Sequence, residues 1–233
     1  MPNSINYQLN TKTQQFLAQS QKLFISNEWV NPTNKETLPV VNPANGTQLT
    51  EIAIANKADV DIAVSTARKA FNETWSTITP SERAKLIWKL ADLMERDKLV
   101  LEELETVDNG KPLDKAVEDI EVAIEHFRYY AGWATKIEGS SIPVGSDKLV
   151  YTRKEPLGVV GLIVPWNFPL MIAAWKLAPA LACGNCCVLK PAEQTSLTAL
   201  YLGNLIQEAG FPAGVVNIVT GPGFPTGDAI SRH

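Results

Sequence analysis

Three short motifs in the second half of the chain combine residue types that could bind or transform a small molecule. The first holds an amide that can donate hydrogen bonds, the second a charged pair, and the third glycines that let a backbone approach a ligand closely. The motifs are Pro165-Trp166-Asn167-Phe168-Pro169, Lys190-Pro191-Ala192-Glu193 and Gly221-Pro222-Gly223.

Each motif also has a purely structural interpretation. Asn167 could shape a turn and cap the helix that follows it. Lys190 and Glu193 could be an ion pair on a solvated loop. The glycines, taken with Gly227, are spaced G-x-G-x-x-x-G, which is not the dinucleotide-binding fingerprint, so a plain turn is the simpler interpretation.

The elements that must carry these motifs repeat as strand, turn and helix. Continuous apolar strands that alternate with helices predict a parallel α/β sheet, and ligands of such sheets bind beyond the carboxyl ends of the strands. Each motif follows one expected strand. The expected pairs are strand 159–164 with helix 170–182, strand 186–190 with helix 197–209, and strand 215–219 with a helical stub at Thr226.

The first part of the chain has a different pattern. Short extended stretches separated by turn residues predict strands, and apolar residues at helical spacing predict a helical segment. A further stretch alternates like an exposed strand. The strands are expected at 22–25, 28–30 and 38–41, the helices at 59–72, from 81, at 99–107 and at 112–137, and the exposed strand at 149–155.

Three cysteines within five positions raise the possibility of a metal or redox site. Cys186 and Cys187 would point to opposite faces of the strand that contains them, and the histidines His126 and His233 are remote in sequence. Buried structural thiols, together with Cys183, are therefore the favoured interpretation, and no metal site is predicted.

Composition excludes some classes of partner. The net charge is −4 and basic residues are scattered among acidic ones, so a nucleic-acid-binding surface is not expected. Residues 1–21 lack the features of a secretory signal, which predicts a cytoplasmic protein. The stretch from Leu157 to Trp175 has no charge, but Pro165 and Pro169 interrupt it, so a strand, turn and helix are favoured over a membrane span.

The ordered motifs give the chain a family resemblance. The three strand-end motifs occur together with Trp175-Lys176-Leu177-Ala178-Pro179-Ala180-Leu181 and Glu208-Ala209-Gly210-Phe211-Pro212. In this order they resemble the aldehyde dehydrogenase superfamily. The likeness extends upstream through Asn42-Pro43, Asp108-Asn109-Gly110-Lys111-Pro112 and Tyr130-Ala131-Gly132-Trp133, so it covers almost everything after about residue 20.

The resemblance implies an aldehyde dehydrogenase-like α/β fold with an incomplete Rossmann-like parallel sheet and crossover helices, preceded by an N-terminal hairpin and a helical segment. The expected divisions are a polar leader at 1–21, the first part of the cofactor domain at 22–138, an oligomerisation-type hairpin segment at 139–156 and a truncated NAD-binding segment at 157–233. The catalytic domain is expected to be absent, and the pairing partner of strand 149–155 is expected from the missing C-terminal part. Because no further strand follows, the edge of the sheet is expected to be an exposed pairing surface.

The resemblance also assigns roles to residues. The matching Asn in the family donates to the oxyanion formed when a cysteine attacks the aldehyde, which makes Asn167 the expected catalytic residue. Glu193 would accept from the adenosine ribose and repel a 2′-phosphate, which favours NAD over NADP. The expected cofactor residues are Val164, Pro165, Trp166, Asn167, Lys190, Pro191, Ala192, Glu193 and Gly223, and the expected substrate residues are Phe168, Met171 and Trp175.

The function implied is NAD-dependent oxidation of an aldehyde to a carboxylic acid, with a small-molecule aldehyde as substrate and homo-oligomers among full-length relatives. The family's nucleophilic Cys and water-activating Glu lie further along, in chains roughly twice this length. We therefore expect the chain to be inactive alone. The alternatives are a non-catalytic nucleotide-binding or interaction protein, an inactive gene fragment, and a related reductase of acyl phosphates, which the Pro-Trp-Asn-Phe-Pro motif disfavours.

Overall fold

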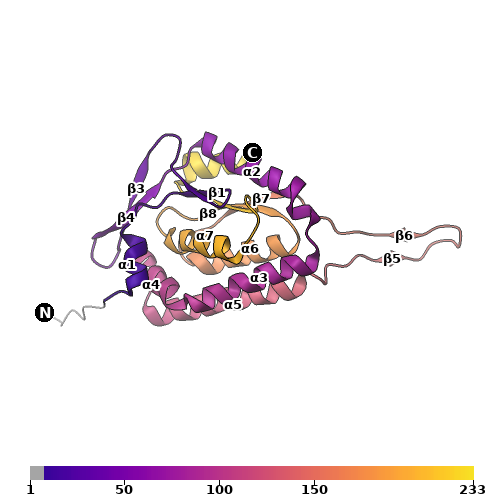
Figure 1. The fold of residues 1–233 in the computed structure, drawn as a ribbon, viewed down its shortest axis with the longest axis horizontal. Coiled ribbons are helices and arrows are strands. Elements are labelled where there is room, and N and C mark those ends of the chain that lie inside the picture. Colours follow the sequence, from indigo (N-terminus) through magenta and orange to yellow (C-terminus); the bar gives the residue numbers. More distant parts are fainter. Residues whose placement is uncertain (1–7) are drawn as a thin grey trace.

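A five-stranded sheet forms the centre of the computed structural model, which describes residues 8–233 (Figure 1). The strand order is β2-β1-β9-β8-β7, and β7, β8 and β9 are parallel, with Val159 opposite Cys186 and Cys187 opposite Val216. The predicted parallel α/β arrangement is therefore confirmed. The strands are β1 (Leu23–Ile25), β2 (Glu28–Val30), β7 (Val159–Ile163), β8 (Cys186–Lys190) and β9 (Val216–Ile218).

The two crossover helices, α6 (Pro169–Ala182) and α7 (Leu197–Ala209), lie on one face of this sheet. Proline begins α6, and Gly210 ends α7 in the left-handed conformation, which agrees with the helices expected at 170–182 and 197–209. The opposite face is covered by α2 (Lys57–Glu73) and by α8 (Asp228–Ser231) (Figure 1). Every residue of β8 is buried between these layers.

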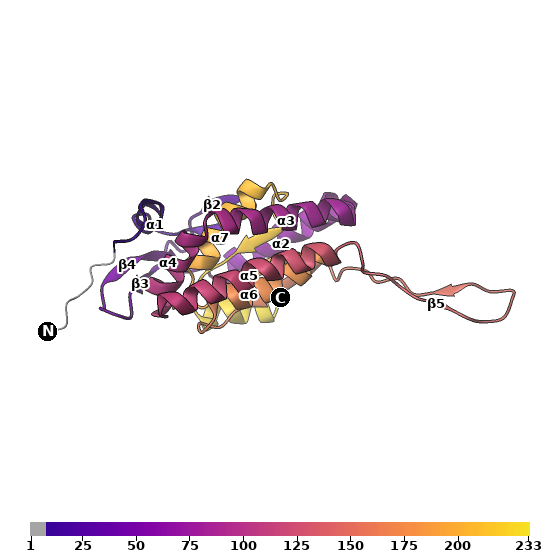
Figure 2. The same cartoon turned by 90° about the horizontal axis from the view of Figure 1, so that it is seen from below.

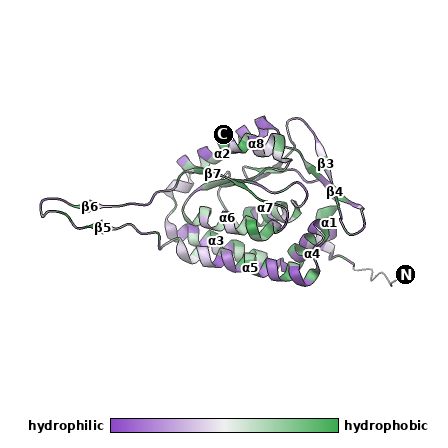
Figure 3. Cartoon of the chain, turned by 180° about the vertical axis from the view of Figure 1, so that it is seen from behind, coloured by the Kyte–Doolittle hydropathy of each residue, from purple (hydrophilic) through white to green (hydrophobic). Residues whose placement is uncertain are grey.

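A second helical layer packs behind α6 and α7. It consists of α3 (Pro80–Arg96), α4 (Lys98–Asn109) and α5 (Leu113–Trp133). Figure 3 shows hydrophobic colouring on α6 and α7, while hydrophilic colouring is frequent on the outward parts of α2 and α5. The predicted end of α5 at 137 was too late, because residues 135–140 are mostly exposed and have no core to pack against.

The sheet edge next to β9 is covered by another strand of the chain. β1 pairs with it in antiparallel orientation, with Phe24 opposite Ile218. The hairpin at 22–30 had been predicted, but its docking on β9 depends on packing that joins segments far apart in the sequence. The outer edge of β7 has no neighbouring strand among the residues that the structure describes.

A second hairpin was half predicted. β3 (Thr37–Val41) matches the expected strand, and it pairs with β4 (Gln48–Ala53), which the sequence analysis missed. The buried side of β4 includes a threonine, Thr50, whose Oγ1 donates to the carbonyl of Gln19 at 2.7 Å. This polar inward residue hides the alternation by which a strand is recognised.

Helix α1 (Thr11–Leu17) lies in the region expected to be a polar leader. Asn10 caps it, and the backbone N–H of Asn10 donates to Glu103 of α4 at 2.9 Å. Thr13 is fully buried against the same carboxylate. Residues from about 10 onward are therefore part of the folded body, while the start of the leader lies outside the described residues.

A long arm projects from the body and carries two short strands, β5 (Ser141–Ile142) and β6 (Val150–Tyr151) (Figures 1 and 2). The strand expected at 149–155 is thus shorter than predicted. Within the chain it pairs with β5, with Ser141 opposite Tyr151. The further partner expected from outside the chain stays a prediction. Leu149 and Tyr151 are 79% and 67% exposed on this arm.

The uncharged stretch from Leu157 to Trp175 forms β7, a loop and the first half of α6. Within residues 8–233, the structure has no helix whose length and apolarity would suffice to span a bilayer.

Candidate functional site

The loop after β7 presents the first motif. Val164 is buried and its N–H donates to the carbonyl of Lys190 at 2.9 Å, which fixes the start of the loop. The next residues, Pro165 to Phe168, are exposed. Phe168 occupies the N-cap position of α6 and no side chain caps that helix, so the capping role considered for Asn167 is not present. The amide of Asn167 has no partner among the described residues and can donate to a ligand.

The loop after β8 is tied to the loop after β9 through one buried lysine. Lys190 is only 2% exposed, and its Nζ donates to the carbonyls of Pro191 at 2.9 Å and Gly221 at 2.6 Å. Its ammonium also lies 3.6 Å from the Glu193 carboxylate. Burial lowers the pKa of Lys190, against the attraction of Glu193. The pair is therefore a partly enclosed one, not a solvated loop pair.

The loop after β9 requires glycine at one position. Gly221 has φ of 141°, and a Cβ there would meet Oγ1 of Thr226 at 2.2 Å. Gly223 has nothing within 4 Å of such a Cβ and lies exposed at the rim. Gly223 therefore leaves open surface next to the loop. Gly221 allows the loop backbone to pack closely against Thr226.

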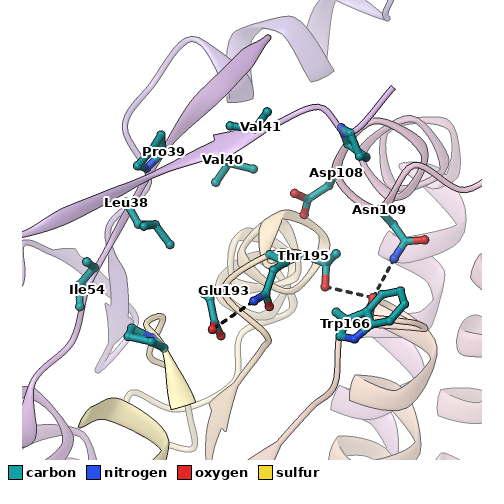
Figure 4. Close-up of a pocket in the computed structure, with 13 residues that line it drawn as sticks. Leu38, Pro39, Val40, Val41, Ile54, Asp108, Asn109, Trp166, Glu193 and Thr195 are labelled. Carbon is teal, nitrogen blue, oxygen red and sulfur yellow. Dashed lines mark hydrogen bonds between the residues drawn. The ribbon is translucent and has the colours of Figure 1, made fainter. Parts of the chain in front are cut away.

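These three loops meet at a cleft of about 730 Å³ (Figure 4). The loops supply one wall, and the hairpin β3–β4 and the end of α4 supply the other. The sequence analysis missed the second wall, because β4 was not predicted and nothing in the sequence places β3 near the strand ends. The lining residues are Leu38, Pro39, Val40, Val41, Pro43, Ile54, Asp108, Asn109, Trp166, Glu193, Gln194, Thr195 and Pro222.

The cleft gathers only part of the expected set. Trp166 and Glu193 line it, whereas the other expected cofactor residues lie behind its surface or at its rim: Val164, Pro165, Asn167, Lys190, Pro191, Ala192 and Gly223.

Asp108 is the buried acid of this cleft. It is 3% exposed, and its Oδ2 accepts from the N–H of Leu197 at the start of α7 at 2.8 Å. Its Oδ1 has no partner among the described residues. Burial raises the pKa of Asp108 well above its usual range, against the Leu197 hydrogen bond. The motif at 108–112 pointed to this region only through the family resemblance.

The residues expected to contact the substrate do not share one environment. Phe168 and Trp175 are 37% and 45% exposed, whereas Met171 is 9% exposed and therefore buried. Ile172 is half-buried and lies one helical turn from Phe168, whose carbonyl accepts from the Ile172 N–H at 3.0 Å. The outward face of α6 is thus made by Phe168, Ile172 and Trp175, not by Met171.

The cysteines are not a catalytic or metal-binding cluster. Burial raises the pKa of Cys186 to about 12 and raises that of Cys187 further, so neither is a thiolate near neutral pH. Cys183 is exposed, which corrects the expectation that all three are buried. Across residues 8–233 no group of His, Cys, Asp or Glu side chains is arranged to hold a metal ion.

Comparison with known proteins gives a consistent result. The sequence profile of the aldehyde dehydrogenase family matches residues 29–233. Retinal dehydrogenase 2 of Homo sapiens is 54% identical over 215 residues, which are 91% of this chain and 42% of the human protein. The mitochondrial aldehyde dehydrogenase of Rattus norvegicus is 52% identical over 215 residues, which are 91% of this chain and 41% of the rat protein.

A solved structure agrees with these relatives. The NAD+ complex of an aldehyde dehydrogenase from Bacillus cereus superposes with a TM-score of 0.96 at 49% identity, covering 97% of this chain and 46% of the other. The chain therefore spans slightly less than half the length of the relatives it matches.

Proposed function

The chain belongs to the aldehyde dehydrogenase family, and from this premise we propose that it is the cofactor-binding part of an enzyme that oxidises an aldehyde to a carboxylic acid with NAD. The observation that carries the proposal is the convergence of the loops after β7, β8 and β9 on one cleft. This is where parallel α/β sheets bind ligands. The Bacillus cereus relative binds NAD+ in its solved structure, which supports the choice of cofactor.

The residues of the cleft fit a dinucleotide. Glu193 lines the cleft and is partly exposed, so its carboxylate can accept from a ribose hydroxyl and would repel a 2′-phosphate. Lys190 holds two of the loops together from below through the carbonyls of Pro191 and Gly221. Gly223 leaves open space at the rim, where the adenine would lie. We propose NAD as the cofactor, with NADP disfavoured.

Asn167 would act on the aldehyde oxygen. When a thiolate adds to the aldehyde carbon, the C=O π electrons move to oxygen and produce an oxyanion. NAD+, when bound, would supply the acceptor for a hydride from this carbon, and water would then hydrolyse the thioester to the carboxylic acid and the thiol. The unpartnered amide of Asn167 can donate to that oxyanion, a contribution of about 3 kcal/mol for one well-placed donor.

The remaining roles follow from exposure. We propose Phe168 and Trp175 as contacts for the aldehyde, because both side chains are exposed on the face of α6 next to Asn167. The thiolate and the water-activating carboxylate would come from outside these 233 residues. We also propose that the exposed arm of β5 and β6 serves homo-oligomer assembly. A cytoplasmic location stays a prediction from the sequence.

The test is calorimetric titration of the purified chain with NAD+ and NADP+. We expect NAD+ to bind and Glu193→Gln to weaken NAD+ about tenfold, since a hydrogen bond to a charged group contributes about 1.5 kcal/mol. Glu118→Gln on α5 removes an exposed acid far from the cleft and should leave the affinity unchanged. Absence of NAD+ binding, or equal binding of NADP+, would contradict the cofactor assignment.

The same protein incubated with NAD+ and aliphatic or aromatic aldehydes should produce no NADH at 340 nm. Steady NADH formation would show that the nucleophile lies within the chain. It would refute the proposal that the thiolate comes from outside these 233 residues.

A further inference from the structure

The turn between α4 and α5 has a role that the cofactor site does not explain. It contains the motif Asp108-Asn109-Gly110-Lys111, whose residues contact several elements in and around the cleft. Asp108 accepts from the first N–H of α7, and a Cβ at Gly110 would lie 2.7 Å from Pro43 of the β3–β4 loop. The turn therefore joins the two walls of the cleft.

Asn109 contacts the loop that carries Asn167. Its Nδ2 donates to the carbonyl oxygen of Trp166 at 2.7 Å, and Oγ1 of Thr195 donates to the same oxygen at 3.2 Å. Figure 4 shows both bonds meeting at Trp166 from opposite elements. That carbonyl belongs to the peptide unit whose nitrogen is the backbone N of Asn167. Two donors from the end of α4 and the loop after β8 thus fix this peptide plane.

The loop needs such an anchor, because its own side chains make few contacts that would hold it in place. Trp166 is 61% exposed and Asn167 has no side-chain partner among the described residues. An exposed loop without anchors samples many backbone conformations. A donor that stabilises developing charge must instead be held within about 0.5 Å of its working position.

Lys111, in the same turn as Asn109, contacts the residue that follows Asn167. The Nζ of Lys111 lies 4.6 Å from the ring centroid of Phe168, within cation–π range. Lys111 is itself held by Glu105 at 3.3 Å and by Asp119. Phe168, immediately after Asn167, is therefore seated on a side chain that comes from the same turn.

We propose that Asn109, assisted by Thr195, is a positioning residue that orients Asn167 by holding the Trp166 carbonyl. The role of Asn167 in this statement rests on the function proposed above, but the positioning itself is a property of the chain. Asn109 touches no reacting atom. Its effect passes through one peptide unit to the amide that would donate to the oxyanion.

The experiment uses the full 233-residue chain, labelled with ¹⁵N and studied by NMR. Asn109→Asp removes the donor and places an oxygen against the Trp166 carbonyl. We expect the order parameter of the Asn167 backbone amide to fall from about 0.85 to below about 0.6. Thr195→Val should produce a smaller fall, because the bond that it removes is longer, and Thr195→Ser should restore the order.

Asn27→Asp is the matched control. Asn27 Nδ2 also donates to a backbone carbonyl, that of Phe211, at 2.7 Å, but it lies in the turn between β1 and β2. We expect it to leave Asn167 ordered. If Asn109→Asp fails to fold, the pair Thr195→Val and Thr195→Ser still tests the proposal.

The outcomes separate this proposal from the cofactor assignment. Unchanged order at Asn167 in both Asn109→Asp and Thr195→Val would overturn the positioning role, as would equal loss of order in Asn27→Asp. NAD+ affinity is measured on the same samples as a separate readout, because Asn109 and Thr195 also line the cleft while Lys190 and Glu193 are untouched. Loss of order together with no NAD+ binding by any variant or by the parent chain would refute the cofactor assignment and leave the positioning role supported.

Discussion

The two ends of α4 each hold a buried aspartate, and the pKa values of the two carboxyls are shifted in opposite directions. Asp97 is the N-cap residue at one end and is 5% exposed, and Asp108 lies in the last turn at the other and is 3% exposed. Burial disfavours the charged form at both positions. Burial alone therefore cannot explain why the pKa values move in different directions.

Hydrogen-bond donors explain the difference. Burial opposes ionisation of Asp97, but donors surround it: Lys12 at 2.7 Å, Arg96 at 2.9 Å and the Tyr201 hydroxyl at 2.7 Å. Together they hold the pKa of Asp97 well below its usual range. Asp108 has one donor, the Leu197 N–H, and burial raises its pKa well above the usual range.

The comparison separates an anchoring end from a functional end of one helix. At Asp97 the charges join α1, α3 and α7 and leave no capacity for a ligand. At Asp108 one buried carboxyl oxygen stays without a partner among the described residues, and the residue lines the cleft where the three strand-end loops meet. Unsatisfied buried polar atoms of this kind concentrate at functional sites.

The largest effect is expected from Asp97→Asn, which tests the anchoring end. A neutral amide leaves Lys12 without its counter-charge and leaves Arg96 with Glu208 alone. We expect the free energy of unfolding to fall by about 2 to 3 kcal/mol. Both partners are partly exposed and can be rehydrated, which keeps the loss at the lower end for a broken buried pair. Urea denaturation at pH 7 measures it.

The control for this prediction is Asp92→Asn. Asp92 is 56% exposed and pairs with Arg128 at 3.3 Å on the surface, so the free energy of unfolding should fall by about 0.5 kcal/mol or less.

The pH dependence of the Asp97→Asn effect provides a second check. Because the folded-state pKa of Asp97 is depressed, its contribution is present above the unfolded value of about 3.9 and is lost as the pH falls below it. The difference between parent and Asp97→Asn should therefore shrink towards pH 3; a constant difference would contradict the ionic explanation.

A smaller effect is expected from Gly110→Ala. It tests whether the close contact with Pro43 restricts the end of α4 at the cleft. Gly110 and Gly210 both end helices with positive φ, of 80° and 88°. Alanine should cost about 1 kcal/mol at either position for the backbone alone. At Gly110 the Cβ also lies 2.7 Å from Cγ of Pro43, whereas Gly210 has nothing within 4 Å. We expect a loss of about 2 kcal/mol for Gly110→Ala against about 1 for Gly210→Ala in thermal or urea unfolding. Equal losses would mean that Pro43 moves away from the new methyl group without a cost in stability.

The sequence predicted the regions whose structure is decided locally. Strand β8 and helix α7 were located to the residue, because an uninterrupted apolar strand and a helix ended by glycine have clear signals. The meeting of the three motifs also followed from local information, since parallel neighbouring strands end at the same edge. Trp166 and Glu193 accordingly lie on one cleft.

The missed features all depend on contacts between distant segments. The wall at Leu38 to Val41 exists because β3 pairs with β4, whose inward Thr50 gives no apolar alternation. Helix α1 is short and polar and is held by the distant Glu103. Asn109 was noted only as part of a motif, because nothing local indicates that its amide reaches Trp166, 57 positions further along the chain.

The smallest effect, and the sharpest test of the comparison, is expected from Asp108→Asn. The side-chain oxygen of the new asparagine can still accept from the Leu197 N–H. The substitution removes only the negative charge, which burial disfavours. The folded-state pKa of Asp108 is raised, so the parent loses stability as the pH rises above the unfolded value of about 3.9. At pH 7 the variant should therefore match the parent or gain up to about 1 kcal/mol, and Asp108→Ala should lose about 1 to 2 kcal/mol because Leu197 N–H then has no acceptor. A loss in Asp108→Asn as large as that in Asp97→Asn would mean that both ends of α4 are anchors, and that the free carboxyl oxygen at the cleft has no separate role.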